Sequence, residues 1–212
     1  TLRAFSGLLG CLAIVMTWFT CRMHMGKKGA VLAASLIASS PFSIRYATEV
    51  RMYSLIIFLL LCIYINFYKA TQNANSKNRF FYALSIACLL LTHYWSLFFI
   101  SVLILTLLVK AKTTSGEEKK NYRSLIMWSL GACVPFAFWL PVFFEQLKHT
   151  GTPWANAPRP TVVLALTLEA FGGGKGSEAL LVAVALSLLV ALGTFTRINE
   201  KGSGLEIGFS EL

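Results

Sequence analysis

Aspartate is absent from this 212-residue sequence, and charged residues of all kinds make up only 13% of it. About a quarter of the residues in soluble globular domains are charged, so an ordinary water-soluble domain is excluded. In place of charge the chain has 56% hydrophobic residues, 16 Phe and a mean hydropathy of +0.66. This composition predicts a chain whose main solvent is lipid.

Sequence motifs that are typical of several classes of soluble protein are missing as well. The five cysteines form no CxxC pair and have no metal-type His nearby, so we interpret them as small apolar packing residues. The glycine run at residues 172–176 lacks the GK[ST] ending of a phosphate-binding loop, which leaves flexibility as its expected role. The net charge of +10 comes from short basic clusters between apolar runs. That pattern is typical of membrane topology and argues against a nucleic-acid partner.

The beginning of the sequence gives no secretion signal. It opens at Thr1 without Met, and no charged region and small-residue cleavage site flank the first apolar run. We therefore expect this run to be a membrane segment and expect a further part of the protein upstream.

Recurring apolar runs predict an all-α, multi-pass transmembrane helical bundle. A helix rises about 1.5 Å per residue and the hydrocarbon layer is about 30 Å thick, so runs of roughly 20 residues suffice to cross it. Helices also satisfy their own backbone hydrogen bonds in lipid. About seven membrane segments are predicted, at residues 5–21, 29–44, 52–68, 80–92, 95–109, 125–144 and 178–196. The transmembrane domain is expected over 1–198, followed by an irregular tail over 199–212.

The fourth and fifth segments come from one apolar stretch. As a single helix, Phe80 to Val109 would be about 45 Å long, so we predict a bend at residues 92–95, Thr-His-Tyr-Trp. One long, strongly tilted helix is the alternative.

Basic residues orient this predicted bundle. If the first segment runs from outside to inside, 13 of the 19 Lys and Arg fall in one set of loops, which the positive-inside rule makes cytoplasmic. The outer face then holds residues 40–55, the turn at 92–95 and a long loop from Glu145 to Ser177. We expect any chemistry on that outer face of a cell (inner or plasma) membrane.

A polar cluster is predicted at the outer end of the second and third segments. It consists of Arg45, Tyr46, Glu49, Arg51 and Tyr53. Charges so close to hydrocarbon need a partner or a ligand. If a helix starts at about Thr48, Glu49 and Tyr53 share one face, and the arginines can reach a phosphate or carboxylate group. The alternative is an ion-paired loop with interfacial tyrosines.

Three further residues are candidates on the same outer face. His93 and Tyr94 lie in the predicted turn, where an imidazole can bind a metal ion, an acidic group or a sugar hydroxyl. Trp154, between Pro153 and Pro158, can stack on a sugar ring. All three are also typical of the aromatic belt at a membrane interface.

Four sequence stretches resemble one family in the expected order. The run SPFSIRYATEVRMYSL, after a span rich in Ala and Ser, resembles the signature after the fourth span of bacterial GT-C glycosyltransferases related to protein mannosyltransferases and aminoarabinose transferases. LRAFSGLLGCLAIV precedes it, and LLLTHYWSLFF and WLPVFFEQLKHTGTPWANAPRP follow. The resemblance implies a partial GT-C fold and inverting transfer of a sugar from a polyprenyl-phosphate carrier to a lipid, glycan or protein acceptor at the outer or periplasmic face.

The resemblance also implies roles for individual residues. The family's expected base is an acidic residue in an outer loop upstream of the matched region, and this chain has no Asp, so we expect it to be inactive by itself. Glu49 corresponds to a second acidic position and is assigned to the acceptor or to a divalent ion. Arg45 and Arg51 are assigned to the donor phosphate or to fixing Glu49, and His93 and Tyr94 to the opposite wall.

Two other classes stay open at this stage. A secondary transporter would also need charges and several helices, but it predicts broken helices near the midplane. A non-catalytic membrane subunit would explain the absent Asp. The sequence leaves the need for a metal ion open, and implies no other cofactor.

Overall fold

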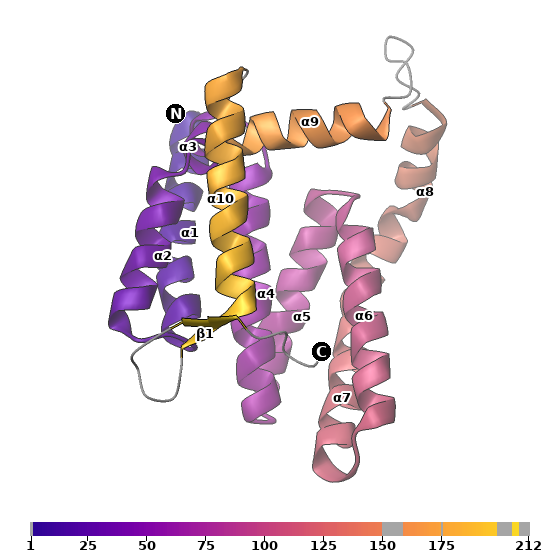
Figure 1. Cartoon of the computed structure of the whole chain (residues 1–212). Coiled ribbons are helices and arrows are strands. Elements are labelled where there is room, and N and C mark those ends of the chain that lie inside the picture. The colour runs from indigo at the N-terminus through magenta and orange to yellow at the C-terminus, as the bar shows by residue number, and fades with distance from the viewer. Residues whose placement is uncertain (1, 150–158, 175, 199–204, 208–212) are drawn as a thin grey trace. The chain divides into compact units, whose positions relative to one another are not determined.

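The computed structural model describes residues 2–149, 159–174, 176–198 and 205–207. It divides into two compact units, residues 1–152 and 153–212, and Figure 1 labels their helices. The described part of the first unit is a bundle of α-helices: α1 (Leu2–Arg22), α2 (Lys27–Ser39), α3 (Pro41–Thr48), α4 (Tyr53–Gln72), α5 (Ser76–Thr92), α6 (Ser96–Thr113), α7 (Gly116–Ala132) and α8 (Val134–His149). The all-α prediction is confirmed for this unit.

Helix α5 lies at the centre of the first unit and packs against α4 and α7. Tyr82, Ile86 and Leu90 of α5 are completely buried, as is Leu125 of α7. Burial of one such apolar side chain stabilises a fold in water by about 1.5–3 kcal/mol, whereas between helices in lipid close van der Waals contact and hydrogen bonds take over that role. The core therefore depends on shape more than on hydrophobicity.

Helices α1, α2, α3 and α4 form the other side of the unit, with α1 packed on each of the other three. The contact between α1 and α3 is close, since a Cβ atom on Gly10 would lie 2.7 Å from the Cβ of Ala47. Small residues allow such approach in membrane helices. This contact fixes the helix that carries Arg45.

Two of the predicted segments are bent pairs of helices. The axes of α2 and α3 differ by 58° at Ser40, and those of α7 and α8 differ by 41° at Cys133. Pro41 explains the first break because proline removes a backbone donor and disfavours helical conformation in the residue before it. The segments predicted over 29–44 and 125–144 are thus each interrupted.

The bend predicted at residues 92–95 is confirmed. Helix α5 ends at Thr92 and α6 begins at Ser96, which excludes one long helix. His93 is extended, with φ −154° and ψ 126°, and the hydroxyl of Ser96 donates to the Leu89 carbonyl oxygen at 3.2 Å. The turn is therefore held by side-chain as well as backbone bonds.

The second unit contains α9 (Pro160–Phe171) and α10 (Ser177–Phe195), followed by the antiparallel strands β1 (Thr196–Ile198) and β2 (Leu205–Ile207). Two predictions are corrected here. The segment over 145–177 is not all loop, because α8 continues to His149 and α9 forms within it. The tail is not wholly irregular, because backbone pairing with β1 makes residues 205–207 a strand. The domain bounds at 198 stay a prediction.

Several helices are long and apolar enough to span a membrane. Among the described residues, α1 (over Arg3–Arg22), α4 and α6 meet this description, and up to five spans result if each bent pair crosses as one. Phe98 and Val102 on α6 are 68% and 63% exposed, which suits a surface in contact with lipid. The length and composition of these helices indicate a membrane protein.

Candidate functional site

The predicted polar cluster lies in and around the connection between α3 and α4. Arg45 and Tyr46 belong to α3, Glu49 and Arg51 to the non-helical residues 49–52, and Tyr53 begins α4. The helix predicted from about Thr48 is wrong, because α3 ends at Thr48 and the backbone of Glu49 is extended. Glu49 and Tyr53 therefore do not share a helical face.

Glu49 is held between two guanidinium groups. Arg45 Nε donates to Glu49 Oε1 at 3.0 Å, and Arg51 Nε lies 3.4 Å from Glu49 Oε2. Oε2 is shielded from solvent and receives no hydrogen bond, so the second contact is electrostatic only. The carboxylate thus positions both arginines.

Both arginines keep donors free. Their side chains are 50% and 60% exposed, whereas that of Glu49 is 29% exposed. Within the described residues, no hydrogen bond or ion pair uses the terminal nitrogens of Arg45 or Arg51. A guanidinium group presents five donors in a planar fork that matches phosphate. The cluster can therefore bind an anionic group while Glu49 remains in place.

An aromatic row connects this cluster to the turn between α5 and α6. The rings of Tyr46 and Tyr53 are 4.5 Å apart, and those of Tyr53 and His93 are 6.4 Å apart. The hydroxyl of Ser54 donates to the Tyr46 carbonyl oxygen at 2.8 Å, which fixes the beginning of α4 against α3. His93 accepts from the Trp95 backbone N–H through Nδ1 at 3.2 Å, which leaves Nε2 for a ligand. This row of rings places the turn beside the cluster.

Tyr94 points toward α8. Its hydroxyl donates to Gln146 Oε1 and accepts from Trp139 Nε1 at 3.0 Å, and its ring lies 4.8 Å from that of Phe143. Tyr94 therefore links the turn to α8, and it lines the same hollow as His93. Trp154 lies outside the described residues.

Two hollows flank Met52, which lines both of them. One, of about 580 Å³, is bounded by Phe5, Ser6, Leu9, Val50, Arg51, Met52, Tyr53 and Leu55. The other, of about 820 Å³, is bounded by Met52, Leu91, Thr92, His93, Tyr94, Trp95, Leu97, Phe98, Ser101, Trp139, Phe143 and Leu147. Each combines a mostly apolar lining with a few polar groups, as ligand sites do. Together they offer room for an amphiphilic molecule with an anionic group.

Residues of α8 were not among the predicted site residues. Trp139, Phe143 and Leu147 follow one another at intervals of four and so lie on one face of that helix. This periodicity was a signal in the sequence, but the bend at Cys133 decides where the face points.

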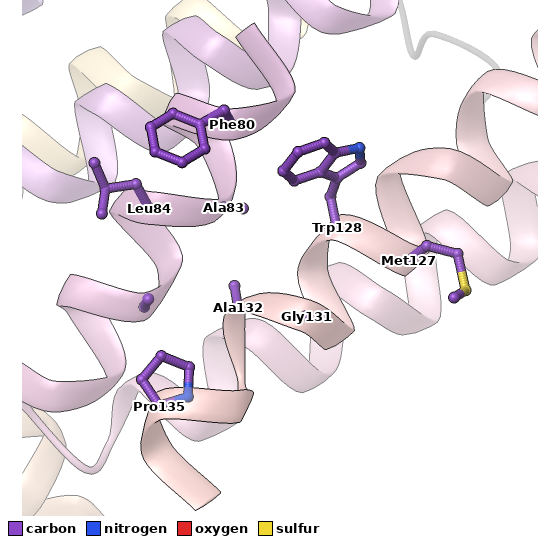
Figure 2. A pocket seen from close by; sticks show the side chains of 9 residues that line it. Phe80, Ala83, Leu84, Met127, Trp128, Gly131, Ala132 and Pro135 are labelled. Atoms are coloured by element: carbon purple, nitrogen blue, oxygen red, sulfur yellow. The ribbon is translucent and has the colours of Figure 1, made fainter. Parts of the chain in front are cut away.

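A hollow between α5 and the α7–α8 pair offers no comparable chemistry (Figure 2). Figure 2 shows the rings of Phe80 and Trp128 on opposite sides of this space of about 470 Å³. None of the described residues that line it is charged, and the small residues Ala83, Gly131 and Ala132 leave it open. It can hold an apolar chain but lacks groups for catalysis.

Metal-ligating side chains do not gather in the described part of the chain, where no three or more His, Cys, Asp or Glu lie close enough to hold an ion. That the site binds a divalent ion, which the sequence left open, therefore stays a prediction.

Comparison with protein-family models, with curated proteins and with solved structures gives no match to this chain. The family resemblance accordingly depends on the motif residues themselves.

Proposed function

We propose that this chain is part of an integral membrane glycosyltransferase that uses a polyprenyl-phosphate-linked sugar. One observation supports the proposal above all: Glu49 holds Arg45 and Arg51, and Arg51 lines an apolar hollow where α4 begins. The GT-C fold, the seven crossings, the outer-face location and the cell membrane are parts of the same proposal.

The polyprenyl-phosphate sugar donor has two chemical groups that this site can bind. Its phosphate carries the negative charge that guanidinium groups recognise, and its isoprenoid tail suits an apolar lining. Arg51 also lines the smaller hollow, beside Tyr53. We therefore assign the donor phosphate to Arg45 and Arg51, and the sugar to the space between Tyr53, His93 and Tyr94.

The reaction is an inverting displacement at the anomeric carbon. The acceptor hydroxyl oxygen forms a bond to that carbon, the bond from carbon to the phosphate oxygen breaks, and polyprenyl phosphate leaves with the electron pair. Arginine donors stabilise the charge that develops on the leaving group. The hydroxyl proton goes to a carboxylate base, for which the family uses a residue absent from this Asp-free sequence. We expect this chain alone to bind the donor without completing transfer.

Binding of polyprenyl phosphate to the purified chain tests the proposal without requiring the base. We expect Arg51→Gln to weaken binding about tenfold or more, because a hydrogen bond to a charged group contributes about 1.5–3 kcal/mol. Lys148→Gln serves as the control, since Lys148 is 70% exposed and pairs with Glu145 outside the cluster. Equal binding by wild-type protein and Arg51→Gln, or equal binding of polyprenol without phosphate, would contradict the proposal.

A secondary transporter is the second candidate, favoured by the two bent helix pairs. Such interruptions allow polar backbone groups to line a path through the membrane. Uptake of a soluble anion into liposomes, with no transfer from any polyprenyl-phosphate sugar, would favour this candidate.

A further inference from the structure

Three basic side chains surround a hollow at the end of the first unit remote from Glu49. Helix α6 begins beside His93 and extends 18 residues, about 27 Å, before it turns into α7. The hollow at this turn has a volume of about 300 Å³. It is lined by Leu108, Ala111, Lys112, Lys119, Arg123 and Ile126. By the positive-inside rule this end is the cytoplasmic one.

Helical spacing brings the three cations together. Leu108 and Lys112 lie four residues apart on α6, and Lys119 and Arg123 lie four apart on α7, so each pair shares a face. Gly116, with φ +63°, adopts the left-handed conformation that glycine favours and begins α7 directly after the turn. The two faces therefore meet across the hollow.

The cations around the hollow have no acidic partner among the residues that the structure describes. Glu117, in the first turn of α7, pairs with Lys120 at 2.6 Å. In the described ranges Lys112, Lys119 and Arg123 make no ion pair. Like charges at such spacing repel one another, and an anion between them would relieve that repulsion.

Apolar surface continues from this hollow toward the membrane interior. Ala111 and Ile126 form a buried floor, at 7% and 9% exposure, while Leu105, on the α6 face that carries Lys112, is 60% exposed. A ligand that satisfies both surfaces has an anionic head and acyl chains. Basic pockets between membrane helices on the cytoplasmic side bind such headgroups.

We propose that Lys112, Lys119 and Arg123 bind the phosphate headgroup of an anionic phospholipid from the cytoplasmic leaflet. The acyl chains lie along the exposed apolar faces of α6 and α7. This site is separate from the one proposed for glycosyl transfer, at the other end of α6. Its lipid would hold the α6–α7 turn at the membrane surface.

Native mass spectrometry of the purified chain titrated with phosphatidylglycerol tests the proposal. We expect one tightly bound phosphatidylglycerol per chain and no comparable binding of phosphatidylcholine. The triple variant Lys112→Gln, Lys119→Gln, Arg123→Gln should bind phosphatidylglycerol at least about tenfold more weakly, since each basic residue near an anionic surface contributes measurably.

A matched control variant distinguishes a specific lipid site from general attraction of the lipid to basic residues. Arg22→Gln, Lys27→Gln, Lys28→Gln removes the same charges, one Arg and two Lys, at the α1–α2 turn. The control should bind phosphatidylglycerol as the wild type does. Equal losses of lipid binding in the two triple variants, or no loss in either, would overturn the proposal. Displacement of the lipid by inorganic phosphate at the same concentration as the lipid would overturn it too.

A single substitution keeps the test valid if the triple variant fails to fold. Lys119→Gln should weaken lipid binding and Lys119→Arg should restore it, because the charge is retained. Unchanged binding in Lys119→Gln would contradict the site.

Discussion

The hydroxyl groups of Tyr82 and Ser129 lie 2.8 Å apart in the core, where α5 packs on α7. Both residues are completely buried, and Ser129 also donates to the Leu125 carbonyl oxygen at 2.8 Å. Because a serine hydroxyl has one hydrogen, Tyr82 is the donor between the two side chains. This bond joins the helix that leads to His93 with the helix that leads to α8.

Removing this hydrogen bond should destabilise the bundle. Tyr82→Phe is expected to lower the free energy of unfolding by about 1 kcal/mol, as for other hydrogen bonds between membrane helices. Ser129→Ala should cost at least as much, because it leaves the buried Tyr82 hydroxyl without its acceptor, and the double variant should lose less than the sum of the two. Thermal unfolding in detergent measures this, with Tyr64→Phe as the control, since Tyr64 is 42% exposed and, in the described part of the chain, its hydroxyl bonds only to His24. Strictly additive losses would show that the two hydroxyls do not interact.

Two glycines of α1 provide a matched pair for the contact with α3. A Cβ on Gly10 would lie 2.7 Å from Ala47 Cβ, whereas a Cβ on Gly7 has its nearest neighbour, the Ala47 carbonyl oxygen, at 3.8 Å. Either change to alanine gains about 1 kcal/mol in helix propensity, but overpacking costs about 1–3 kcal/mol. We expect Gly7→Ala to raise the melting temperature and Gly10→Ala to lower it.

The same two substitutions in α1 also test the arginine cluster, because Ala47 lies between Arg45 and Glu49 in the chain. Gly10→Ala should therefore weaken polyprenyl phosphate binding, and Gly7→Ala should leave it unchanged. Equal melting temperatures and equal binding in the two variants would refute the close contact between α1 and α3.

Sequence patterns predicted the helices better than the connections between them. Apolar runs located α1, α4 and α6 to within a few residues, since lipid demands continuous apolar surface. The bend at residues 92–95 followed from length alone. Hydropathy did not show the bends at Ser40 and Cys133, because apolar composition continues across both.

The sequence predicted which residues form the polar cluster but not how they are arranged. Charges beside hydrocarbon identified Arg45, Glu49 and Arg51, and the structure joins them. The expected helix through Glu49 was wrong, since the extended residue there turns the chain into α4. The contacts of Tyr94 with Trp139 and Gln146, about 50 residues away in the chain, depend on tertiary structure that no local pattern encodes.

Arg51 should contribute to transfer far more than to folding. Its side chain is 60% exposed, and exposed ion pairs contribute about 0–1 kcal/mol to stability. In the full gene product that contains this chain, Arg51→Ala should lower kcat at least about tenfold with the melting temperature nearly unchanged. Arg51→Lys should restore transfer only in part, because an ammonium group lacks the planar fork. A normal transfer rate in Arg51→Ala would remove this residue from the site.

Sugar transfer from a synthetic polyprenyl-phosphate hexose, assayed in liposomes with the full gene product, tests the central claim most directly. We predict transfer by the wild type, its loss in a folded Glu49→Gln variant, and its retention in Glu145→Gln, where the carboxylate pairs with Lys148 and His149 on its own helix. Absence of turnover of any carrier lipid by the folded wild type, or equal rates in all three proteins, would contradict the assignment of this site to glycosyl transfer.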